Sequence, residues 1–186
     1  WNFDKEPLYF VNPKSYDEDR PYLEDMFKHF AEPLKTQLLA KARRTAEPRS
    51  GRVNYDIDGR LVGNWFREGS GGFEGPKNVQ NQGGGRYWDG HLSITYDYID
   101  PTKIVFSIGN FDGRAAQFNV AGNNPDPASV SMEQGLIKYE LQQYNAFKGT
   151  ALVQLVTGGK LKVETFPNQK RDMVKGFTGQ AQIYVR

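Results

Sequence analysis

From about residue 51 to its end, this chain alternates apolar and polar side chains with a period of two. Successive side chains of a β-strand point to opposite faces of its sheet, so such an alternation predicts strands that each bury one face. The pattern recurs in about nine short segments, with turn residues and no helical pattern between them. It favours an antiparallel meander over a fold in which strands alternate with helices.

The expected strands follow one another at short intervals. They lie at residues 52–57, 61–66, 88–98, 104–108, 116–120, 137–141, 151–155, 161–165 and 179–186. Asp58-Gly59 separates the first two, and because this pair readily takes the positive φ of a type I′ turn, we expect residues 52–66 to form a hairpin. The stretch from Asn123 to Pro127 contains two prolines and predicts a surface loop.

A sheet of this size exposes unpaired backbone groups at both edges unless it closes on itself. About eight to ten sequential antiparallel strands suit an up-and-down β-barrel, which removes both edges. We therefore expect a mainly β protein in which residues 51–186 form one antiparallel β-barrel domain. A two-sheet β-sandwich is the alternative architecture.

Residues 1–50 show a helical pattern instead. The run from Asp17 to Pro21 has the carboxylates and the early proline of a helix start, and apolar residues follow at helical spacing as far as Phe30. A second helix is expected from about Pro33. The basic residues between positions 35 and 52 are interpreted as a solvated helix end. We expect this N-terminal helical segment to pack on the outside of the barrel or across one end.

A glycine-rich connection, residues 68–86, separates the second and third expected strands. Glycine runs can cradle phosphate, but that use needs a following helix N-terminus or a P-loop lysine, and the next element here is expected to be a strand. A connection of this length is more typical of a mobile loop or a lid. Phe73 is its large apolar residue and is placed to close over the mouth of a barrel.

Gly63-Asn64-Trp65 reads Gly-x-Trp near the start of the meander, and Arg186 ends the last expected strand. With the long loop that follows, this combination resembles the lipocalins and the wider calycin barrels. The resemblance implies that Trp65 lies at the closed end of the barrel, that Gly63 permits close backbone approach, and that Arg186 packs over the indole ring. It also implies a ligand cavity without identifying the ligand. The strand at 52–57 and the N-terminal helical segment depart from the family pattern.

Composition excludes several classes of site and partner. The absence of cysteine removes disulfides and thiol chemistry, and two histidines are too few for a His-rich metal site. With 24 Lys and Arg against 22 Asp and Glu, no strong field attracts nucleic acid. No apolar run approaches the roughly 18 residues of a transmembrane helix. The start at Trp1 and the lack of cysteine favour a processed bacterial chain that is periplasmic or secreted, with a cytoplasmic location as the alternative.

One expected strand face carries residue types that are suited to chemistry. Asp89, His91, Ser93, Thr95 and Asp97 share a face, which we interpret as facing solvent, with a functional cavity as the alternative. No nucleophile elbow, zinc-protease, P-loop or dinucleotide motif is present. The sequence therefore predicts no catalytic residue, metal ligand or cofactor.

These observations together predict a protein that binds a small apolar or aromatic molecule. Aromatic side chains on the strands and the glycine-rich loop supply surface for such a ligand. The expected ligand-binding residues are Phe73, Trp88, Tyr96, Tyr98 and Tyr139. A small-barrel enzyme of the isomerase, cyclase or hydratase type is the alternative, and an interaction module of a larger exported protein is a second one.

Overall fold

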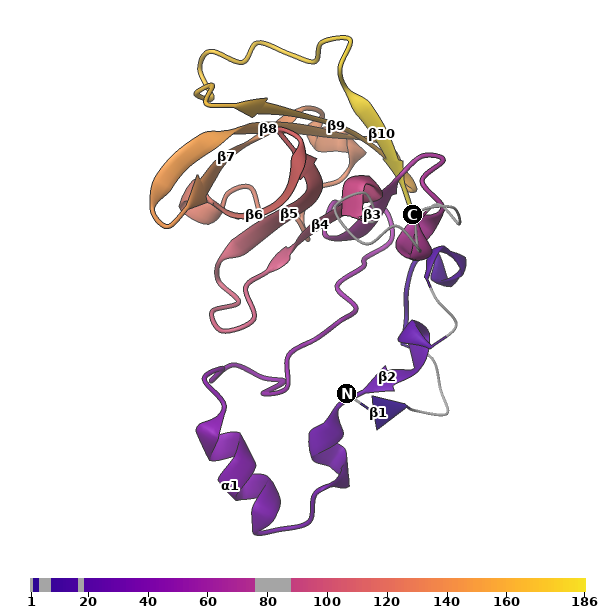
Figure 1. Ribbon diagram of the computed structural model, residues 1–186, viewed down its shortest axis with the longest axis vertical. Helices are drawn as coiled ribbons and strands as arrows, with labels where there is room; N and C mark the ends of the chain where they lie inside the picture. Colours follow the sequence, from indigo (N-terminus) through magenta and orange to yellow (C-terminus); the bar gives the residue numbers. More distant parts are fainter. Residues whose placement is uncertain (1, 4–7, 17–18, 76–87) are drawn as a thin grey trace.

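The structure, a computed structural model, describes residues 2–3, 8–16, 19–75 and 88–186. Eight antiparallel strands close into a barrel in the order β10-β3-β4-β5-β6-β7-β8-β9 (Figure 1). The strands are β3 (Gly63–Arg67), β4 (His91–Tyr96), β5 (Ile104–Phe111), β6 (Arg114–Val120), β7 (Ile137–Gln143), β8 (Ala146–Thr157), β9 (Lys160–Pro167) and β10 (Gln182–Val185). Each pairs with the next along the chain, and β10 returns to pair with β3. The up-and-down barrel is confirmed, and the sandwich alternative is wrong.

The barrel interior is filled by the apolar side chains that the alternation points inward. Trp65, Phe106 and Tyr139 are the largest of them and are fully buried. The same cluster draws on every strand of the barrel, including Leu161 from β9 and Tyr184 from β10. The interior is therefore a packed core across its middle.

The expected strand at 52–57 is wrong. Asp58-Gly59 does form a turn, in which the Arg60 N–H donates to the Ile57 carbonyl at 3.1 Å, but residues 52–62 have no ladder partner. They cross the end of the barrel as a loop, where side chains satisfy their backbone groups. Arg186, for example, donates to the Ile57 carbonyl at 2.6 Å. The barrel therefore has one strand fewer than the alternation predicts.

The N-terminal segment is only partly helical. Where the first helix was expected, 3₁₀ turns at Arg20–Tyr22 and Met26–His29 flank β2 (Leu23–Glu24), which pairs with β1 (Asn2–Phe3). The Asp25 side chain caps the second turn by accepting from the Phe27 N–H at 2.8 Å, which ends any continuous helix at that point. The second expected helix is present as α1 (Leu34–Lys41).

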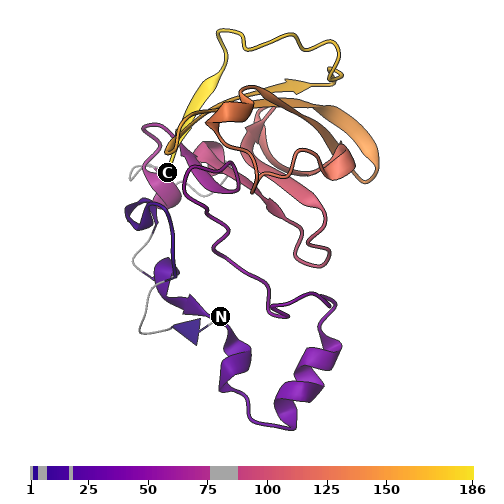
Figure 2. The ribbon, with the colours of Figure 1, turned by 180° about the vertical axis from the view of Figure 1, so that it is seen from behind.

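Helix α1 stands away from the barrel, at the far end of the molecule (Figures 1 and 2). None of its residues is buried. The division of the chain into an N-terminal segment, residues 1–50, that packs on the barrel and a barrel domain, residues 51–186, stays a prediction. No helix in the described part of the chain has both the length and the apolar character needed to cross a bilayer.

Two arginines of the basic stretch are structural, which corrects the interpretation of that stretch as a solvated helix end. Arg44 is buried and donates to the Pro48 carbonyl at 2.7 Å and to the Tyr98 carbonyl at 2.8 Å. Arg49 donates to the Leu39 carbonyl at 2.8 Å. A planar guanidinium can bind several carbonyls at once, so these side chains order the connection after α1 and tie it to the β4–β5 turn.

The third expected strand, 88–98, is shorter than the alternation predicts. Trp88 lies in a 3₁₀ turn, Trp88–Gly90, that precedes β4, and Tyr98 lies in the turn that follows it. The first turn rests on β5 at Gly109, where a Cβ would come within 1.3 Å of the Trp88 carbonyl oxygen. Gly109 thus gives the chain room to leave the strand geometry at Trp88.

Candidate functional site

The closed end of the barrel is built around Trp65 and Arg186. The Arg186 guanidinium carbon lies 3.9 Å from the centre of the Trp65 ring. Its Nη1 donates to the Val62 carbonyl at 2.6 Å, and its Nη2 donates to the carbonyls of Ile57 and Arg60. The Trp65 indole N–H donates to the Leu61 carbonyl at 2.9 Å. This buried arrangement is what the Gly-x-Trp resemblance implies for these residues.

Gly63 is required by the close packing around it. Its φ is +121°, and a Cβ there would lie 2.2 Å from Asp56 Oδ1 and 2.9 Å from Arg186 Nη1. Asp56 is buried and accepts from the Asn64 N–H at 2.9 Å. Burial raises the pKa of this carboxyl, while its hydrogen bonds and Arg186 act in the opposite direction. The closed end therefore serves to seal the barrel.

A hollow lined by aromatic rings lies on the outer wall of the barrel, between β3–β6 and residues Tyr16 and Arg20 of the N-terminal segment. This outer cavity has a volume of about 600 Å³. Its lining residues are Tyr16, Arg20, Val53, Asn64, Phe66, Phe73, Trp88, His91, Leu92, Ser93, Ser107, Ile108, Gly109, Ala115, Ala116 and Gln117. Tyr16 and Phe66 pack edge to face at 5.4 Å in a second apolar cluster, separate from the barrel core. The cavity is thus outside the barrel, whereas the resemblance implies one inside.

Aromatic rings form its rim. His91 lies at the centre, with its ring 5.1 Å from Trp88, 5.5 Å from Phe73 and 5.4 Å from Phe66. The Arg20 guanidinium carbon lies 3.8 Å above the centre of the Phe73 ring. Rings so arranged offer both faces and edges to a flat ligand.

Its floor is made of small and polar side chains. Asn64, Ser93, Ser107 and Gln117 lie side by side across β3–β6 in one register row. They point outward because the residues next to them in each strand belong to the core. Small side chains under an aromatic rim leave the hollow, and their hydroxyl and amide groups supply hydrogen bonds within it.

His91 and Tyr16 are both neutral at physiological pH. Burial lowers the pKa of His91, and Arg20 lowers it further, against the effect of hydrogen bonds with the backbone of Phe73 and Gly72. Burial and the Asp56 carboxylate raise the pKa of Tyr16 well above its ordinary value. No carboxylate of the described residues lines the cavity, so its one formal charge is that of Arg20.

Two of the five residues that the sequence predicts for ligand binding line this cavity, Phe73 and Trp88. The other three lie elsewhere. Tyr139 is fully buried inside the barrel and donates to the Pro125 carbonyl at 2.8 Å. Tyr96 donates to the Asp126 carboxylate near the closed end, and the exposed Tyr98 ring lies against Gly51.

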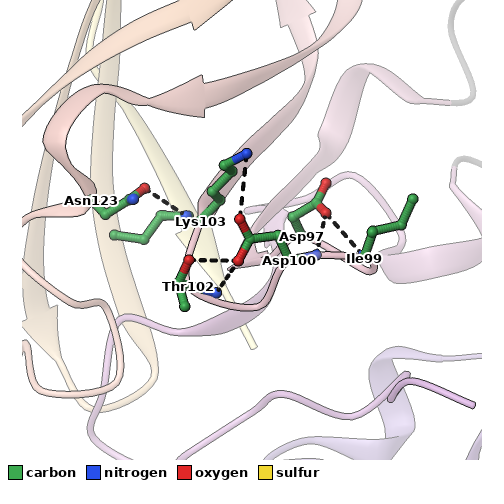
Figure 3. A network of polar contacts seen from close by, with 7 residues as sticks. Asp97, Ile99, Asp100, Thr102, Lys103 and Asn123 are labelled. Carbon is green, nitrogen blue, oxygen red and sulfur yellow. Dashed lines mark hydrogen bonds and ion pairs between the residues drawn. The ribbon is translucent and has the colours of Figure 1, made fainter. Parts of the chain in front are cut away.

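The polar residues that the sequence places on one face of β4, from Asp89 to Asp97, also lie in different parts of the structure. His91 and Ser93 line the outer cavity, whereas Asp97 organises the β4–β5 turn at the other end of the strand (Figure 3). Its Oδ1 accepts from the N–H groups of Ile99 and Asp100, each at 2.9 Å. His91 and Asp97 therefore lie at opposite ends of the strand and do not converge on one point.

A second hollow, the mouth cavity, lies at the open end of the barrel and has a volume of about 410 Å³. Ile108, Val163 and Tyr184, which belong to the barrel interior, reach its inner part. Polar residues surround its opening, among them Arg67, Thr165 and Gln182.

Sequence reasoning missed the contributions of Phe66, Tyr16 and Arg20. Phe66 follows the inward-facing Trp65 directly, and an aromatic residue at an outward position is a signal that something covers it. Tyr16 and Arg20 carried no such signal, because their places depend on how the N-terminal segment crosses the barrel. Most of the glycine-rich loop that was expected to be mobile lies outside the described residues, which here end at Gly75 and resume at Trp88.

No cluster of three or more His, Asp or Glu side chains suited to a metal ion occurs in the described ranges. The closed barrel, its sealed end, the outer cavity and the mouth cavity are the features from which function is inferred. No family model matches the chain, and neither a curated protein nor a solved structure matches it significantly.

Proposed function

We propose that this protein is a lipocalin-like binding protein whose ligand is a small, flat and largely apolar molecule held in the outer cavity. The observation that carries the proposal is the ring of Phe66, Phe73, Trp88 and His91 above a floor of small polar side chains. The eight-stranded barrel with Arg186 over Trp65 supports the lipocalin-like part of it.

The dimensions suit such a ligand. Pockets for small molecules typically have volumes of about 300–1,000 Å³ and combine apolar walls with a few polar groups. The outer cavity has about 600 Å³ and presents serine and glutamine side chains at its floor. A ligand of two or three fused rings fits this volume and finds hydrogen-bond partners for one or two polar atoms.

The chemistry of the lining favours binding over catalysis. A general acid–base mechanism needs groups that exchange protons near neutral pH and lie within reach of each other. The pKa of His91 is lowered and the pKa of Tyr16 is raised, so the two pKa values lie further apart than in the free side chains. No carboxylate is among the described residues that line the cavity.

The test is a fluorescence titration with N-phenyl-1-naphthylamine, a neutral two-part aromatic probe that brightens in apolar surroundings. We expect saturable binding to the wild-type protein. Trp88→Ala removes one wall of the cavity and should weaken binding at least tenfold, which corresponds to about 1.4 kcal/mol. Because Trp88 is half exposed, this change should leave the fold intact.

Tyr98→Ala is the matched control, since Tyr98 is also an exposed aromatic residue next to β4 but lies outside the cavity. It should leave the affinity for the probe unchanged. Equal affinity of the wild type and Trp88→Ala, or a larger loss in Tyr98→Ala, would contradict the proposal.

A further inference from the structure

Charge is distributed unevenly along this chain. Residues 136–186 carry eight of the 24 basic residues and three of the 22 acidic ones, so the small net charge of +2 conceals a basic C-terminal part. That part forms β7 to β10 and the connection from β9 to β10, residues 168–181, which we call the basic loop. The basic loop lies at the opposite end of the molecule from α1 (Figures 1 and 2). The excess positive charge therefore belongs to the side of the barrel that carries this loop.

The basic loop is held against the outside of the barrel by side chains of the strands beneath it. The Thr150 hydroxyl of β8 donates to the Gln169 carbonyl at 2.8 Å, and the Lys138 ammonium of β7 donates to the Val174 carbonyl at 2.5 Å. Val174 itself is buried. Contacts on both sides of residues 170–173 therefore fix how this part of the loop is presented to solvent.

The basic side chains of the loop are exposed. The charged groups of Lys170 and Arg171 have no ion-pair or hydrogen-bond partner in the part of the chain that the structure describes. Lys175 is exposed as well, and its ammonium donates to the Asp172 carbonyl at 2.8 Å rather than to a carboxylate. Three positive charges on one loop are therefore available to an external anion.

Carboxylates on this side of the barrel are fewer and partly engaged. Glu164 is buried, and the Thr178 N–H donates to its Oε2 at 2.7 Å. Glu140 and Asp172 border a hollow of about 690 Å³ beside the loop. The same hollow is bordered by three basic side chains, Lys138, Lys170 and Arg171. Basic groups thus outnumber carboxylates both in this hollow and on the loop.

Apolar side chains are exposed among these charges. Met173 is 68% exposed in the middle of the loop, and the exposed Leu136 borders the hollow beside it. Basic groups around exposed apolar side chains are typical of surfaces that bind anionic bilayers, because the cations bind lipid phosphates while the apolar groups enter the headgroup region. A surface for single-stranded nucleic acid would instead offer free aromatic rings for stacking. The aromatic ring of this loop, Phe177, faces the Lys162 ammonium at 4.7 Å.

We propose that the basic loop is a docking surface for an anionic lipid bilayer, on which Lys170, Arg171 and Lys175 bind lipid phosphates and Met173 enters the headgroup region. The charge of this surface complements that of the bilayer, and the contacts beneath the loop present it without rearrangement. The surface is independent of the proposed ligand site, because none of the described residues borders both the outer cavity and the hollow beside the loop.

Cosedimentation with lipid vesicles tests the proposal. We expect the wild-type protein to partition at least tenfold more strongly onto vesicles of phosphatidylcholine and phosphatidylglycerol than onto vesicles of phosphatidylcholine alone, at low salt. Raising the ionic strength to about 0.5 M should remove most of this preference, because exposed charges are then screened. The triple replacement Lys170→Gln, Arg171→Gln and Lys175→Gln should weaken binding to the anionic vesicles at least tenfold.

The matched control is the triple replacement Lys14→Gln, Lys41→Gln and Arg43→Gln. It removes the same amount of charge from exposed residues of the N-terminal segment, away from the basic loop. It should retain the preference for anionic vesicles.

Labelling of single cysteines locates the contact, since the chain itself contains no cysteine. Met173→Cys carrying the fluorophore nitrobenzoxadiazole should brighten on anionic vesicles, whereas labelled Leu34→Cys, at an exposed apolar position on α1, should not. Trp88→Ala should leave vesicle binding intact, and the triple replacement in the basic loop should leave the binding of N-phenyl-1-naphthylamine intact, so the two proposals can fail separately.

Four results would overturn the proposal. They are equal partitioning of the wild type onto both kinds of vesicle, an equal loss in the control triple variant, brightening at Leu34→Cys without brightening at Met173→Cys, and tighter binding to a short DNA duplex than to anionic vesicles at the same ionic strength.

Discussion

Replacing Arg186 by lysine is the sharpest perturbation of the closed end. The variant keeps the positive charge and removes the planar guanidinium. Arg186 binds the Val62 carbonyl through one terminal nitrogen and the carbonyls of Ile57 and Arg60 through the other, while its plane covers Trp65. An ammonium group is one point and cannot occupy both nitrogen positions.

The magnitude follows from these contacts. Loss of at least one hydrogen bond from a charged group costs about 1.5–3 kcal/mol, and loss of a desolvated cation–π contact adds about 0.5–2 kcal/mol. Arg186→Lys should therefore lower the free energy of unfolding by about 2–5 kcal/mol. Burial already lowers the pKa of Arg186, and a lysine desolvated in its place would be still less stable in its charged form.

Urea denaturation followed by far-UV circular dichroism measures the effect, with the linear extrapolation giving the free energy of unfolding. Arg171→Lys is the control, because Arg171 is exposed, and it should change stability by less than about 0.5 kcal/mol. If Arg186→Lys were as mild as the control, the three carbonyl contacts would not hold the loop across the barrel end, and the reasoning would be refuted.

Three further predictions concern other parts of the fold. Gly109→Ala should lower the free energy of unfolding by about 1–3 kcal/mol and weaken N-phenyl-1-naphthylamine binding, because a Cβ would collide with the Trp88 carbonyl. Gly176→Ala is the control, since nothing lies within 4 Å of a Cβ there, and it should change neither quantity in urea and fluorescence titrations. Because the pKa of His91 is lowered in the folded protein, the unfolded chain binds more protons than the folded one once the pH falls below about 6.5. The free energy of unfolding should therefore decrease between pH 7 and pH 5, by at most about 1.4 kcal/mol per pH unit. His91→Gln should flatten that dependence in thermal melts, and an unchanged slope would count against a desolvated ring. Arg44→Met should destabilise the protein far more than Arg43→Met in urea titrations, since Arg44 is buried on three backbone carbonyls and Arg43 is exposed; equal effects would show that these bonds are worth little.

The barrel could be predicted from the sequence because its strands bury one face each. The alternation around Phe106, Tyr139 and Val153 fixes which side chains face the core, and these residues are all buried. It failed at residues 52–57, where Val53, Tyr55 and Ile57 alternate with polar residues but have no ladder partner. An alternating pattern cannot tell a strand from an extended loop whose carbonyls are bound by a distant arginine.

The candidate site was less accessible to sequence reasoning. Phe73 and Trp88 are brought together because the turn at Trp88 packs on Gly109 and the Phe73 ring meets His91, contacts between residues that are distant in the sequence. The place of Tyr16 depends on the path of the N-terminal segment over the outer wall, which no local pattern encodes. Arg67 is on the same face of β3 as Trp65, so its place at the end of the barrel interior could be predicted from the sequence.

The central claim is that the outer cavity holds the ligand, and amide chemical-shift mapping tests it directly. In ¹H–¹⁵N correlation spectra of the protein saturated with N-phenyl-1-naphthylamine, the account predicts that the largest shift changes cluster at His91, Ser93, Ser107 and Gln117, the residues that line the cavity from neighbouring strands. Changes confined to the mouth of the barrel around Thr165 and Gln182, or no saturable change at all, would contradict the claim.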